Sequence, residues 1–596
     1  MSRFEIRESF YLDGEEFKIL SGAIHYFRLD PSDWYASLYN LKALGFNTVE
    51  TYLPWNLHEE KRGLFDFEGR LDIEAFLKMA QSLGLYAILR PSPYICAEWE
   101  FGGLPAWLLK EQMRIRSSDP AFIEAVASYY DVLLPRLAPF QLDRGGNVLM
   151  MQVENEYGSF GEDKAYLRAI RDLMLERDIT CPLFTSDGPW LATLKAGSLI
   201  EDGIFTTGNF GSRANENFDS MEAFFQSHGR KWPLMCMEFW DGWFNRWKEP
   251  IIKRDAEDLA EAVKECLDRG SINLYMFHGG SNFGFMNGCS ARGRRDLPQV
   301  TSYDYDALLD EAGNPQEKYF AVKRMMAHFF PQYPQMDPII KDHSPSYQIE
   351  LADKVSLFEV KDLLARPVES LYPQSMKELD QAYGYVLYET EAVWDATEER
   401  VRIIDARDRV QVYQDGQYIE TQYQDEIGQD ITIPGYLGQS YHLSFLVENM
   451  GRVNYGHKLL TDTQDKGIRQ GVMKDLHFMT KWKSYSLDLK DLSGLDFSRP
   501  WQPKQAAFYR FPFSVQQPSY NTYINLENFG KGVAIINGHN LGRFWQVGPT
   551  LSLYIPKGFL KEGENELIIF ETEGIYSDTI EVSHQAAFKP LKGDNL

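Results

Sequence analysis

Residues 148–157 read VLMMQVENEY, an apolar run of β type that ends in carboxylates and an amide. Residues 235–240, MCMEFW, share this arrangement, because a second apolar run leads to one carboxylate beside aromatic side chains. Short apolar runs bounded by polar residues are typical of buried strands. The two stretches therefore predict strands that each present an acidic side chain at the carboxyl end.

The region around these stretches has a repeating pattern. From about residue 18 to 325, short β-rich runs alternate with helix-like amphipathic stretches, which indicates βα units around a parallel sheet. Eight strands are predicted at residues 19–23, 48–54, 86–91, 148–154, 182–185, 204–207, 233–237 and 272–277. Helices are predicted between them, for example at 34–44, 72–83 and 255–269, each followed closely by a glycine. The spacing predicts an α/β fold, a (β/α)8 TIM barrel, over residues 1–330.

The rest of the chain loses this rhythm. Residues 331–380 begin with a proline-rich stretch and are predicted to form a connector. Beyond about residue 381, short strands alternate with turn signals such as Asp415-Gly416 and Asn537-Gly538, which is an all-β pattern. We predict two all-β sandwich domains, the first over residues 381–490 and the second over residues 491–596.

Composition argues against several classes of partner. The 596 residues carry a formal charge of −25, and no run rich in lysine or arginine forms a basic groove, so we expect no nucleic-acid partner. Five scattered cysteines without C-x-x-C spacing indicate reduced thiols. No leader-like or membrane-spanning stretch is found. We therefore expect a soluble, cytoplasmic protein without a membrane partner, while display at the cell surface stays open.

Two strand ends carry the candidate chemistry. In TIM barrels function collects at the carboxyl ends of the strands, and Glu156 and Glu238 follow the fourth and seventh strands. A retaining glycosidase needs one protonated carboxylic acid over the leaving oxygen and one ionised carboxylate below the anomeric carbon, roughly 5 Å apart. We interpret the two glutamates as that pair. The alternative for each is a salt-bridged structural residue.

Further side chains at strand ends fit a sugar site. Asn155 offers an amide to a sugar hydroxyl beside the anomeric centre, or else stabilises a turn. Glu98 follows the third strand and could bind two hydroxyls of one sugar, or else belongs to an ion pair. In residues 303–306, YDYD, a phenol could hydrogen-bond the nucleophile carboxylate and hold it ionised. None of these residues identifies a site without the carboxylate pair.

We expect no metal and no cofactor. His25, His58 and His278 lie near strand ends but lack the i, i+4 or paired-cysteine spacing of a zinc site. Residues 278–284, HGGSNFG, are glycine-rich but carry no lysine in a Walker position, which argues against a phosphate loop. We expect this loop to let the backbone approach the ligand closely.

Five strings of the sequence are more specific. They are SGAIHY at 21–26, ETYLPWN at 50–56, RPSPYICAEWE at 90–100, QVENEYG at 152–158 and TSYDYD at 301–306. Together they resemble the glycoside hydrolase family 35 β-galactosidases, and the resemblance covers nearly the whole chain. It implies that Glu156 is the acid/base and Glu238 the nucleophile. The galactose-binding residues that it implies are Tyr52, Cys96 and Ala97 through their backbone, Glu98, Asn155, Trp243 and Tyr305.

The C-terminal part carries the same resemblance. NMGRVNYG at 449–456 and INGHNLGRFW at 536–545 are similar to the family's two galactose-binding-like β domains. This implies jelly-roll domains that are structural, with one loop reaching the site. Whether they bind sugar stays open.

Within the family the chain most resembles compact bacterial members, which favour β-1,3-linked galactose. We therefore expect a retaining exo-β-galactosidase that removes terminal non-reducing β-D-galactose from oligosaccharides or glycan termini, with β-1,3-linked galactose on N-acetylhexosamine preferred. Trp240, Trp243 and Tyr455 are the predicted wall for the aglycone, and a core aromatic of the β domain is the alternative for Tyr455. Trp240 stands where animal members have tyrosine, so their broader substrate range is not carried over. Ser281 replaces a common threonine, a mild change.

Two other functions fit the same residues. A galactoside-binding protein could keep the barrel and lose catalysis, although the intact Glu156, Glu238, Asn155 and Tyr305 speak against it. A related enzyme could act on another terminal sugar such as β-glucosamine, which would want a further carboxylate near the 2-position. The exact aglycone, transglycosylation and the oligomeric state, with a homodimer among the options, stay open.

Overall fold

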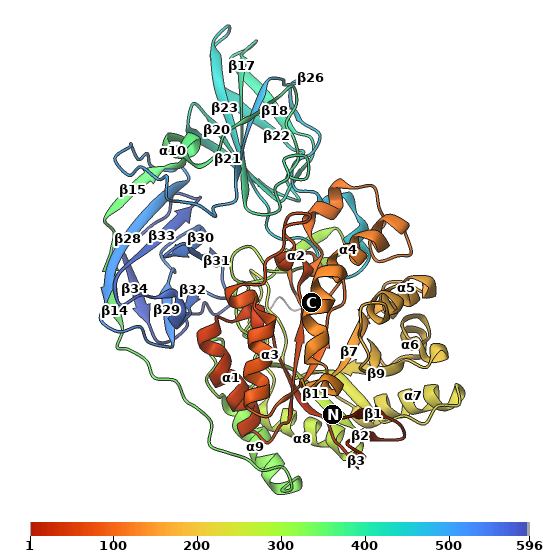
Figure 1. Ribbon diagram of the computed structural model, residues 1–596. Helices are drawn as coiled ribbons and strands as arrows, with labels where there is room; N and C mark the ends of the chain where they lie inside the picture. The colour runs from red at the N-terminus through yellow and green to blue at the C-terminus, as the bar shows by residue number, and fades with distance from the viewer. Residues whose placement is uncertain (1, 593–596) are drawn as a thin grey trace.

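The computed structural model describes residues 2–592. Three bodies follow one another along the chain (Figure 1): a barrel wrapped by helices at the lower right, a first β domain in cyan at the top and a second β domain in blue at the left. The predicted fold class, a TIM barrel followed by all-β domains, is confirmed.

Eight parallel strands close into the barrel, in chain order from β4 to β11. They are β4 (Leu20–Ile24), β5 (Thr48–Tyr52), β6 (Tyr86–Arg90), β7 (Val148–Asn155), β8 (Leu183–Asp187), β9 (Phe205–Phe210), β10 (Met235–Trp240) and β11 (Ser271–His278). Each of the eight predicted strands overlaps one of them. Nearly all their residues are buried, because helices cover the outside of the barrel and side chains fill the inside.

One main helix follows each strand. These helices are α1 (Pro31–Ala43), α3 (Ile73–Ser82), α4 (Pro120–Leu137), α5 (Lys164–Leu175), α6 (Leu191–Gly197), α7 (Ala214–Ser227), α8 (Ala256–Arg269) and α9 (Glu317–Phe329). Aspartates begin several of them: Asp30 accepts a hydrogen bond from the backbone N–H of Ser32, and Asp255 accepts one from that of Glu257. None of the described helices has the length and apolar character needed to cross a membrane.

A small N-terminal sheet covers the amino ends of the barrel strands. It consists of β1 (Phe4–Ile6), β2 (Phe10–Leu12) and β3 (Glu15–Glu16). Phe10 meets Phe205 of β9 edge to face, with ring centroids 5.5 Å apart, in an apolar cluster at this end of the barrel. The carboxyl ends of the strands are therefore the end that remains available for a site.

Each β domain packs two antiparallel sheets. In the first domain they are β16 (Val368–Ser370), β27 (Trp482–Leu487), β17 (Tyr385–Val393), β23 (Ser440–Glu448), β20 (Arg409–Gln414) and β21 (Gln417–Tyr423) against β22 (Asp430–Pro434), β18 (Glu398–Ile403), β25 (Val472–Lys474) and β26 (His477–Phe478). In the second domain they are β14 (Tyr347–Glu350), β34 (Thr579–Ser583), β29 (Thr522–Asn525) and β32 (Ser552–Ile555) against β15 (Asp353–Ser356), β28 (Ala507–Val515), β33 (Gly563–Glu571), β30 (Lys531–Ile536) and β31 (His539–Trp545).

The segment 331–380 is more than the connector that the sequence predicted. Its strands β14 and β15 pair with β34 and β28 of the second β domain, and β16 pairs with β27 of the first. It also holds the helix α10 (Leu357–Leu364). The chain thus enters the second β domain before it builds the first. These strands escaped prediction because none exceeds four residues and their residues are mostly exposed or half-exposed.

Buried ion pairs join the three bodies. Glu448 at the end of β23 lies 2.5 Å from Lys531 Nζ and 3.0 Å from Arg543 Nη1, both in the second β domain. Arg452, in the loop after β23, lies 2.8 Å from Glu100 in a barrel loop. Breaking a buried pair by removing one partner typically costs about 3–5 kcal/mol, so these contacts fix how the domains sit on the barrel.

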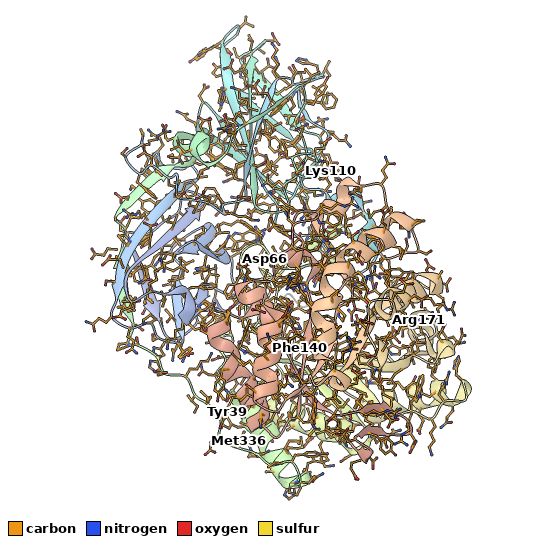
Figure 2. The ribbon with its side chains drawn as sticks, viewed as in Figure 1. Tyr39, Asp66, Lys110, Phe140, Arg171 and Met336 are labelled. Carbon is orange, nitrogen blue, oxygen red and sulfur yellow. The ribbon has the colours of Figure 1, made fainter. Side chains whose placement is uncertain are left out.

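The first β domain reaches over the open end of the barrel. The backbone carbonyl of Asn454 accepts a hydrogen bond from Tyr94 Oη at 2.6 Å. At the surface Lys110 pairs with Asp380 at 2.6 Å, and Figure 2 shows Lys110 on the side of the barrel that faces this domain. The loop after β23 is thereby held against the carboxyl ends of the strands.

Candidate active site

A cavity of about 510 Å³ opens at the carboxyl ends of the barrel strands. Barrel residues line most of it, and residues 454–458 of the first β domain line the remainder. The lining contains every predicted site residue except Tyr52, namely Cys96, Ala97, Glu98, Asn155, Glu156, Glu238, Trp240, Trp243, Tyr305 and Tyr455. The structure thus brings together residues from strands three, four and seven, from the segment after strand eight and from a different domain.

Glu238 stands near the end of β10 and is only 7% exposed. Its Oε1 accepts a hydrogen bond from Tyr52 Oη at 2.5 Å and lies 2.7 Å from Arg90 Nη2, while its Oε2 accepts one from Trp240 Nε1 at 3.2 Å. Three donors on one carboxylate stabilise its negative charge and fix its orientation. Tyr52 therefore lies behind Glu238 rather than in the cavity wall.

Arg90, the last residue of β6, is a buried cation between two carboxylates. Its Nη1 lies 3.8 Å from Glu50 Oε1, whereas its Nη2 lies 2.7 Å from Glu238 Oε1. Burial alone would lower the pKa of Arg90, but Tyr52, Glu238 and Glu50 together raise it. Burial raises the pKa of Glu50 to about 7, although Arg90 opposes this rise. The guanidinium is thus held in its charged form directly behind the site.

Glu156 turns into the cavity immediately after β7. Its backbone is left-handed, with φ 45° and ψ 41°, and its Oε1 accepts a hydrogen bond from Asn209 Nδ2 at 2.9 Å. Burial and, secondly, the charge of Glu238 raise the pKa of Glu156 to about 7, against the opposing effect of Asn209. Such a carboxyl group can both give and take a proton near neutral pH.

Glu154, two residues earlier, is turned away from the cavity. Its carboxylate accepts a hydrogen bond from Tyr166 Oη at 2.5 Å and lies 3.3 Å from Arg116 Nε. These partners leave Glu156 as the one glutamate of the Glu154–Glu156 string that faces the site.

The backbone of Cys96, Ala97 and Glu98 is strained. Their φ angles are 55°, 50° and 48°, a left-handed region that side-chain-bearing residues rarely adopt. Arg28 donates a hydrogen bond to the carbonyl of Ala97, and Asn454 Nδ2 lies 3.4 Å from Cys96 Sγ. Strain of this kind persists only where the surroundings hold it and tends to cluster at functional sites.

Glu98 receives a hydrogen bond from Tyr303. Burial raises the pKa of Glu98 to about 7, while Tyr303 and Arg28 oppose the rise. The expectation that a phenol of residues 303–306 would bond Glu238 is wrong, because the phenol on that carboxylate belongs to Tyr52. Tyr303 cannot serve both groups, since its hydroxyl hydrogen is directed at Glu98.

Asn155 is tied into the same network. Its Oδ1 accepts a hydrogen bond from Arg90 Nη2 at 2.8 Å and lies 2.9 Å from Tyr52 Oη, and its Nδ2 donates to the carbonyl of Ile95 at 3.3 Å. Its partners are residues of the barrel interior and not the backbone of a local turn. The turn-stabilising interpretation is therefore not supported.

Aromatic side chains form one wall of the cavity. The rings of Trp240 and Trp243 meet edge to face at 5.8 Å, and Tyr305 lies 6.5 Å from Trp243. Tyr455 lines the cavity from the first β domain and is 48% exposed. The alternative interpretation of Tyr455 as a domain-core aromatic is wrong.

The three histidines near strand ends are buried and hydrogen-bonded within the protein. His25 contacts Arg28, and His278 contacts Ser37. His58 contacts Tyr26. Within residues 2–592 no group of three or more histidine, cysteine, aspartate or glutamate side chains is arranged to hold a metal ion.

The glycine-rich loop 278–284 does not line the cavity. A Cβ on Gly279 would lie 1.6 Å from the carbonyl oxygen of Tyr303, and Phe283 packs into the core of the second β domain. The expectation that the loop approaches the ligand is wrong, because its glycines allow close approach to the neighbouring segment of the chain instead.

Sequence reasoning missed Arg90, Asn209 and Trp190. Arg90 is the last residue of its strand, where functional residues of a TIM barrel collect, but a glycosidase pattern is recognised by its carboxylates and does not mark a cation. Asn209 was missed because the sixth strand was predicted to end at residue 207, whereas β9 continues to Phe210. Trp190 belongs to the loop after β8 and lines the cavity, and no charged or repeated motif marks it.

Family models match three parts of the chain. "Glycosyl hydrolases family 35" matches residues 9–329, "Beta-galactosidase, first all-beta domain" matches residues 373–488, and "Beta-galactosidase, galactose-binding domain" matches residues 506–565. These ranges correspond to the barrel and the two β domains.

Curated relatives match over nearly the full length. "Beta-galactosidase-1-like protein 3" of Mus musculus is 39% identical over 582 residues, which cover 94% of this chain and 86% of the relative. "Beta-galactosidase-1-like protein 2" of Homo sapiens is 39% identical, with 94% and 88% covered. "Beta-galactosidase" of Xanthomonas manihotis is 38% identical, with 92% and 90% covered. Since animal and bacterial relatives are equally similar, the expected closeness to bacterial members stays a prediction.

The buried Glu50 makes the stability depend on pH. Its folded-state pKa, about 7, lies above the unfolded value of about 4.3. The folded state therefore binds more protons between these values, and this group lowers the stability by up to about 1.4 kcal/mol per unit as pH rises through the window. Glu50→Gln, which cannot ionise, should lose less stability between pH 5 and pH 7 in thermal denaturation.

The matched control is Glu398→Gln on the exposed rim of β18, which should retain the wild-type pH dependence. Parallel pH curves for Glu50→Gln and wild type would show that Glu50 ionises at its ordinary pKa.

Proposed function

The chain belongs to glycosyl hydrolase family 35 and is a β-galactosidase, and we propose that Glu156 is its acid/base and Glu238 its nucleophile in a retaining double displacement. The observation that carries this assignment is the difference between the two carboxyl groups in one cavity. Glu238 receives hydrogen bonds from Tyr52 and Trp240 and faces Arg90. The pKa of Glu156 is raised to about 7 by burial and by the charge of Glu238.

The first displacement uses both groups at once. Glu156 gives its proton to the glycosidic oxygen while a carboxylate oxygen of Glu238 attacks the anomeric carbon. The bond to the aglycone breaks, and galactose becomes an ester of Glu238. The aglycone leaves as a neutral alcohol.

The second displacement depends on the loss of the negative charge of Glu238 in the first displacement. Once Glu238 is esterified, its negative charge no longer raises the pKa of Glu156, so Glu156 remains ionised. It then takes a proton from water, which attacks the anomeric carbon and releases galactose with retained configuration. The electrostatic coupling thus switches one residue from acid to base.

We assign galactose recognition to the polar groups beside this pair. Glu98 offers carboxylate oxygens to two hydroxyls, and Asn155 and Tyr305 offer an amide and a phenol at the same cavity. The left-handed segment from Cys96 to Glu98 lines the same cavity. A rigid, hydrogen-bonded set of this kind favours one sugar epimer over another.

The aromatic wall supports a preference for β-1,3-linked galactose on N-acetylhexosamine. Trp240 donates a hydrogen bond to Glu238 and contacts Trp243, and Tyr455 of the first β domain lines the same cavity. Apolar faces of sugars pack on such rings. A wall contributed by two domains restricts the direction in which an aglycone can leave the site.

Two further expectations remain proposals. A β-glucosamine substrate would want an extra carboxylate near the 2-position, and the described lining has three carboxylates, Glu98, Glu156 and Glu238, each of which already has a role. We therefore favour galactose.

A reducing, cytoplasmic setting is supported by five cysteines that are all free and buried.

Substitution of the two glutamates should separate their roles. Glu238→Gln keeps an oxygen that can accept from Tyr52 and Arg90, so the protein should stay folded but lose at least about 10⁴-fold in kcat. Glu156→Gln should lose about 10² to 10⁴-fold on an oligosaccharide, and less on a dinitrophenyl galactoside, whose leaving group needs no acid. Azide, a nucleophile that needs no base, should rescue Glu156→Gln and give β-galactosyl azide.

Glu176→Gln at the exposed end of α5 serves as the matched control. Galactose release by Glu238→Gln at a rate near wild type, with its melting temperature unchanged, would remove Glu238 from the mechanism. Rescue by azide that gave the α-galactosyl azide would instead identify Glu156 as the nucleophile.

The hydrogen bond from Asn209 to Glu156 should influence the pH at which kcat/KM falls on the alkaline side, the alkaline limb of the pH profile. Glu156 must be protonated to act first, so kcat/KM for an oligosaccharide should fall above pH 7. Asn209→Ala removes a bond that lowers the pKa of Glu156, and the limb should move upward by roughly half to one pH unit. Asn215→Ala, exposed on α7, is the control, and an unmoved limb in Asn209→Ala would show that Glu156 does not control it.

The linkage preference can be measured with matched disaccharides. Galactose release from β-1,3-linked galactosyl-N-acetylglucosamine should exceed release from the β-1,4-linked isomer, with Glu238→Gln as the blank. Tyr455→Ala should narrow the difference, because it removes the half of the wall that the β domain supplies. Equal cleavage by the wild type would keep the mechanism and discard the preference.

A further inference from the structure

A second cavity shares tryptophan side chains with the first. It has a volume of about 410 Å³, and Trp190, Trp240 and Trp243 line both cavities. The two cavities are therefore neighbours that share these tryptophan side chains, and none of the three carboxylates of the first cavity, Glu98, Glu156 and Glu238, lines the second.

Trp190 differs from the other tryptophans of the chain. It is 60% exposed, and within residues 2–592, which include all 13 tryptophans, it is the only one that is mostly exposed. An exposed indole keeps apolar surface in contact with water, which is unfavourable in free energy, whereas a tryptophan in the core avoids this contact. An exposed aromatic face beside a sugar site offers a stacking surface for the apolar face of a pyranose.

The loop that carries Trp190 is anchored. Thr193 Oγ1 donates to the carbonyl of Gly188 at 2.6 Å, and Ser220 Oγ donates to that of Pro189 at 2.6 Å. A Cβ on Gly188 would lie 2.2 Å from the indole, so the ring rests on a position that only glycine leaves free. The exposed ring is thus held in place before any ligand binds, which lowers the entropy cost of binding.

Polar groups of balanced charge surround the second cavity. Arg254 donates to the carbonyl of Gly211 at 2.7 Å and to Asp258 at 2.8 Å. Arg213 lies 3.6 Å from Glu216 at the surface. Each arginine has its own carboxylate, so the cavity suits neutral hydroxyl groups better than an anionic ligand.

We propose that Trp190 and this second cavity bind aglycone sugars beyond the one linked to the departing galactose, so that the enzyme recognises an oligosaccharide chain. This inference rests on the proposed function. An exo-acting enzyme holds the terminal galactose next to Glu156 and Glu238, so the rest of a linear chain extends only toward its reducing end. The second cavity is the adjoining space lined by aromatic side chains in which that extension can lie.

The test compares two substrates that differ only in chain length. One is β-galactosyl-1,3-N-acetylglucosamine, and the other is the same disaccharide extended by β-1,3-linked lactose at its reducing end. Wild type should show at least three-fold higher kcat/KM on the tetrasaccharide. Trp190→Ala should lose about three- to ten-fold more on the tetrasaccharide than on the disaccharide, the size of one aromatic contact, with the loss in KM.

Two variants control for indirect effects. Trp190→Phe keeps an aromatic face and should retain part of the chain-length gain. Tyr436→Ala removes another exposed aromatic side chain, 74% exposed, which belongs to the first β domain but lines neither cavity, and should behave as wild type. Equal losses on both substrates in Trp190→Ala, or no loss on either, would overturn the inference while leaving the β-galactosidase mechanism intact.

A binding measurement separates this inference from the proposed function. Calorimetric titration of Glu238→Gln with the trisaccharide N-acetylglucosaminyl-1,3-galactosyl-1,4-glucose, which lacks the departing galactose, should give binding that the Trp190→Ala substitution weakens about three- to ten-fold. Binding that does not depend on Trp190 would refute the second site. Trp190-dependent binding together with no galactose release from either substrate would refute the proposed linkage preference and keep the second site.

Discussion

Because Arg90 is buried, its charge must be balanced inside the protein, and the 2.7 Å contact with Glu238 does so at the point where the barrel opens. The same guanidinium donates to Asn155 and lies 3.8 Å from Glu50. With the cation fixed, the Glu238 carboxylate is held beside it, and the negative charge of Glu238 contributes to the raised pKa of Glu156. The difference between the two reactive groups thus follows from where one arginine sits.

This arrangement explains why a β domain belongs to the active site. The strained backbone from Cys96 to Glu98 needs surroundings that hold it, and Asn454 of the first β domain supplies a contact to Cys96 Sγ. The ion pair between Arg452 and Glu100 holds that domain in place. Docking of the domain therefore stabilises the loop and also completes the cavity wall.

The sequence predicted the barrel well and the connections poorly, for physical reasons. Barrel strands are buried on both faces, so they stand out as apolar runs, and polar residues at their ends mark the site. By contrast, β14 and β15 gain their structure from pairing with strands more than 150 residues away, and local patterns do not encode such pairing. The exposure of Tyr455 likewise depends on how two domains dock, which no local pattern contains.

In the Glu154–Glu156 string, the regular alternation of side chains between the two faces of a strand is broken, and the active site depends on this irregularity. In a regular strand residues two apart share a face, so Gln152, Glu154 and Glu156 would all point the same way. The pairing register between β7 and β8 shifts between Gln152 and Asn155. Gln152 and Asn155 consequently both bond Arg90 inside the barrel, whereas Glu154 faces Tyr166 in the helix layer.

The left-handed turn at Glu156 then re-aims the next carboxylate into the cavity. Irregularities of this kind are common next to active sites because they redirect one side chain without moving the rest of the sheet. Two acidic residues that alternation would place together are thereby given different surroundings. One becomes a structural ion-pair partner of Arg116, and the other acquires the raised pKa that proton transfer requires.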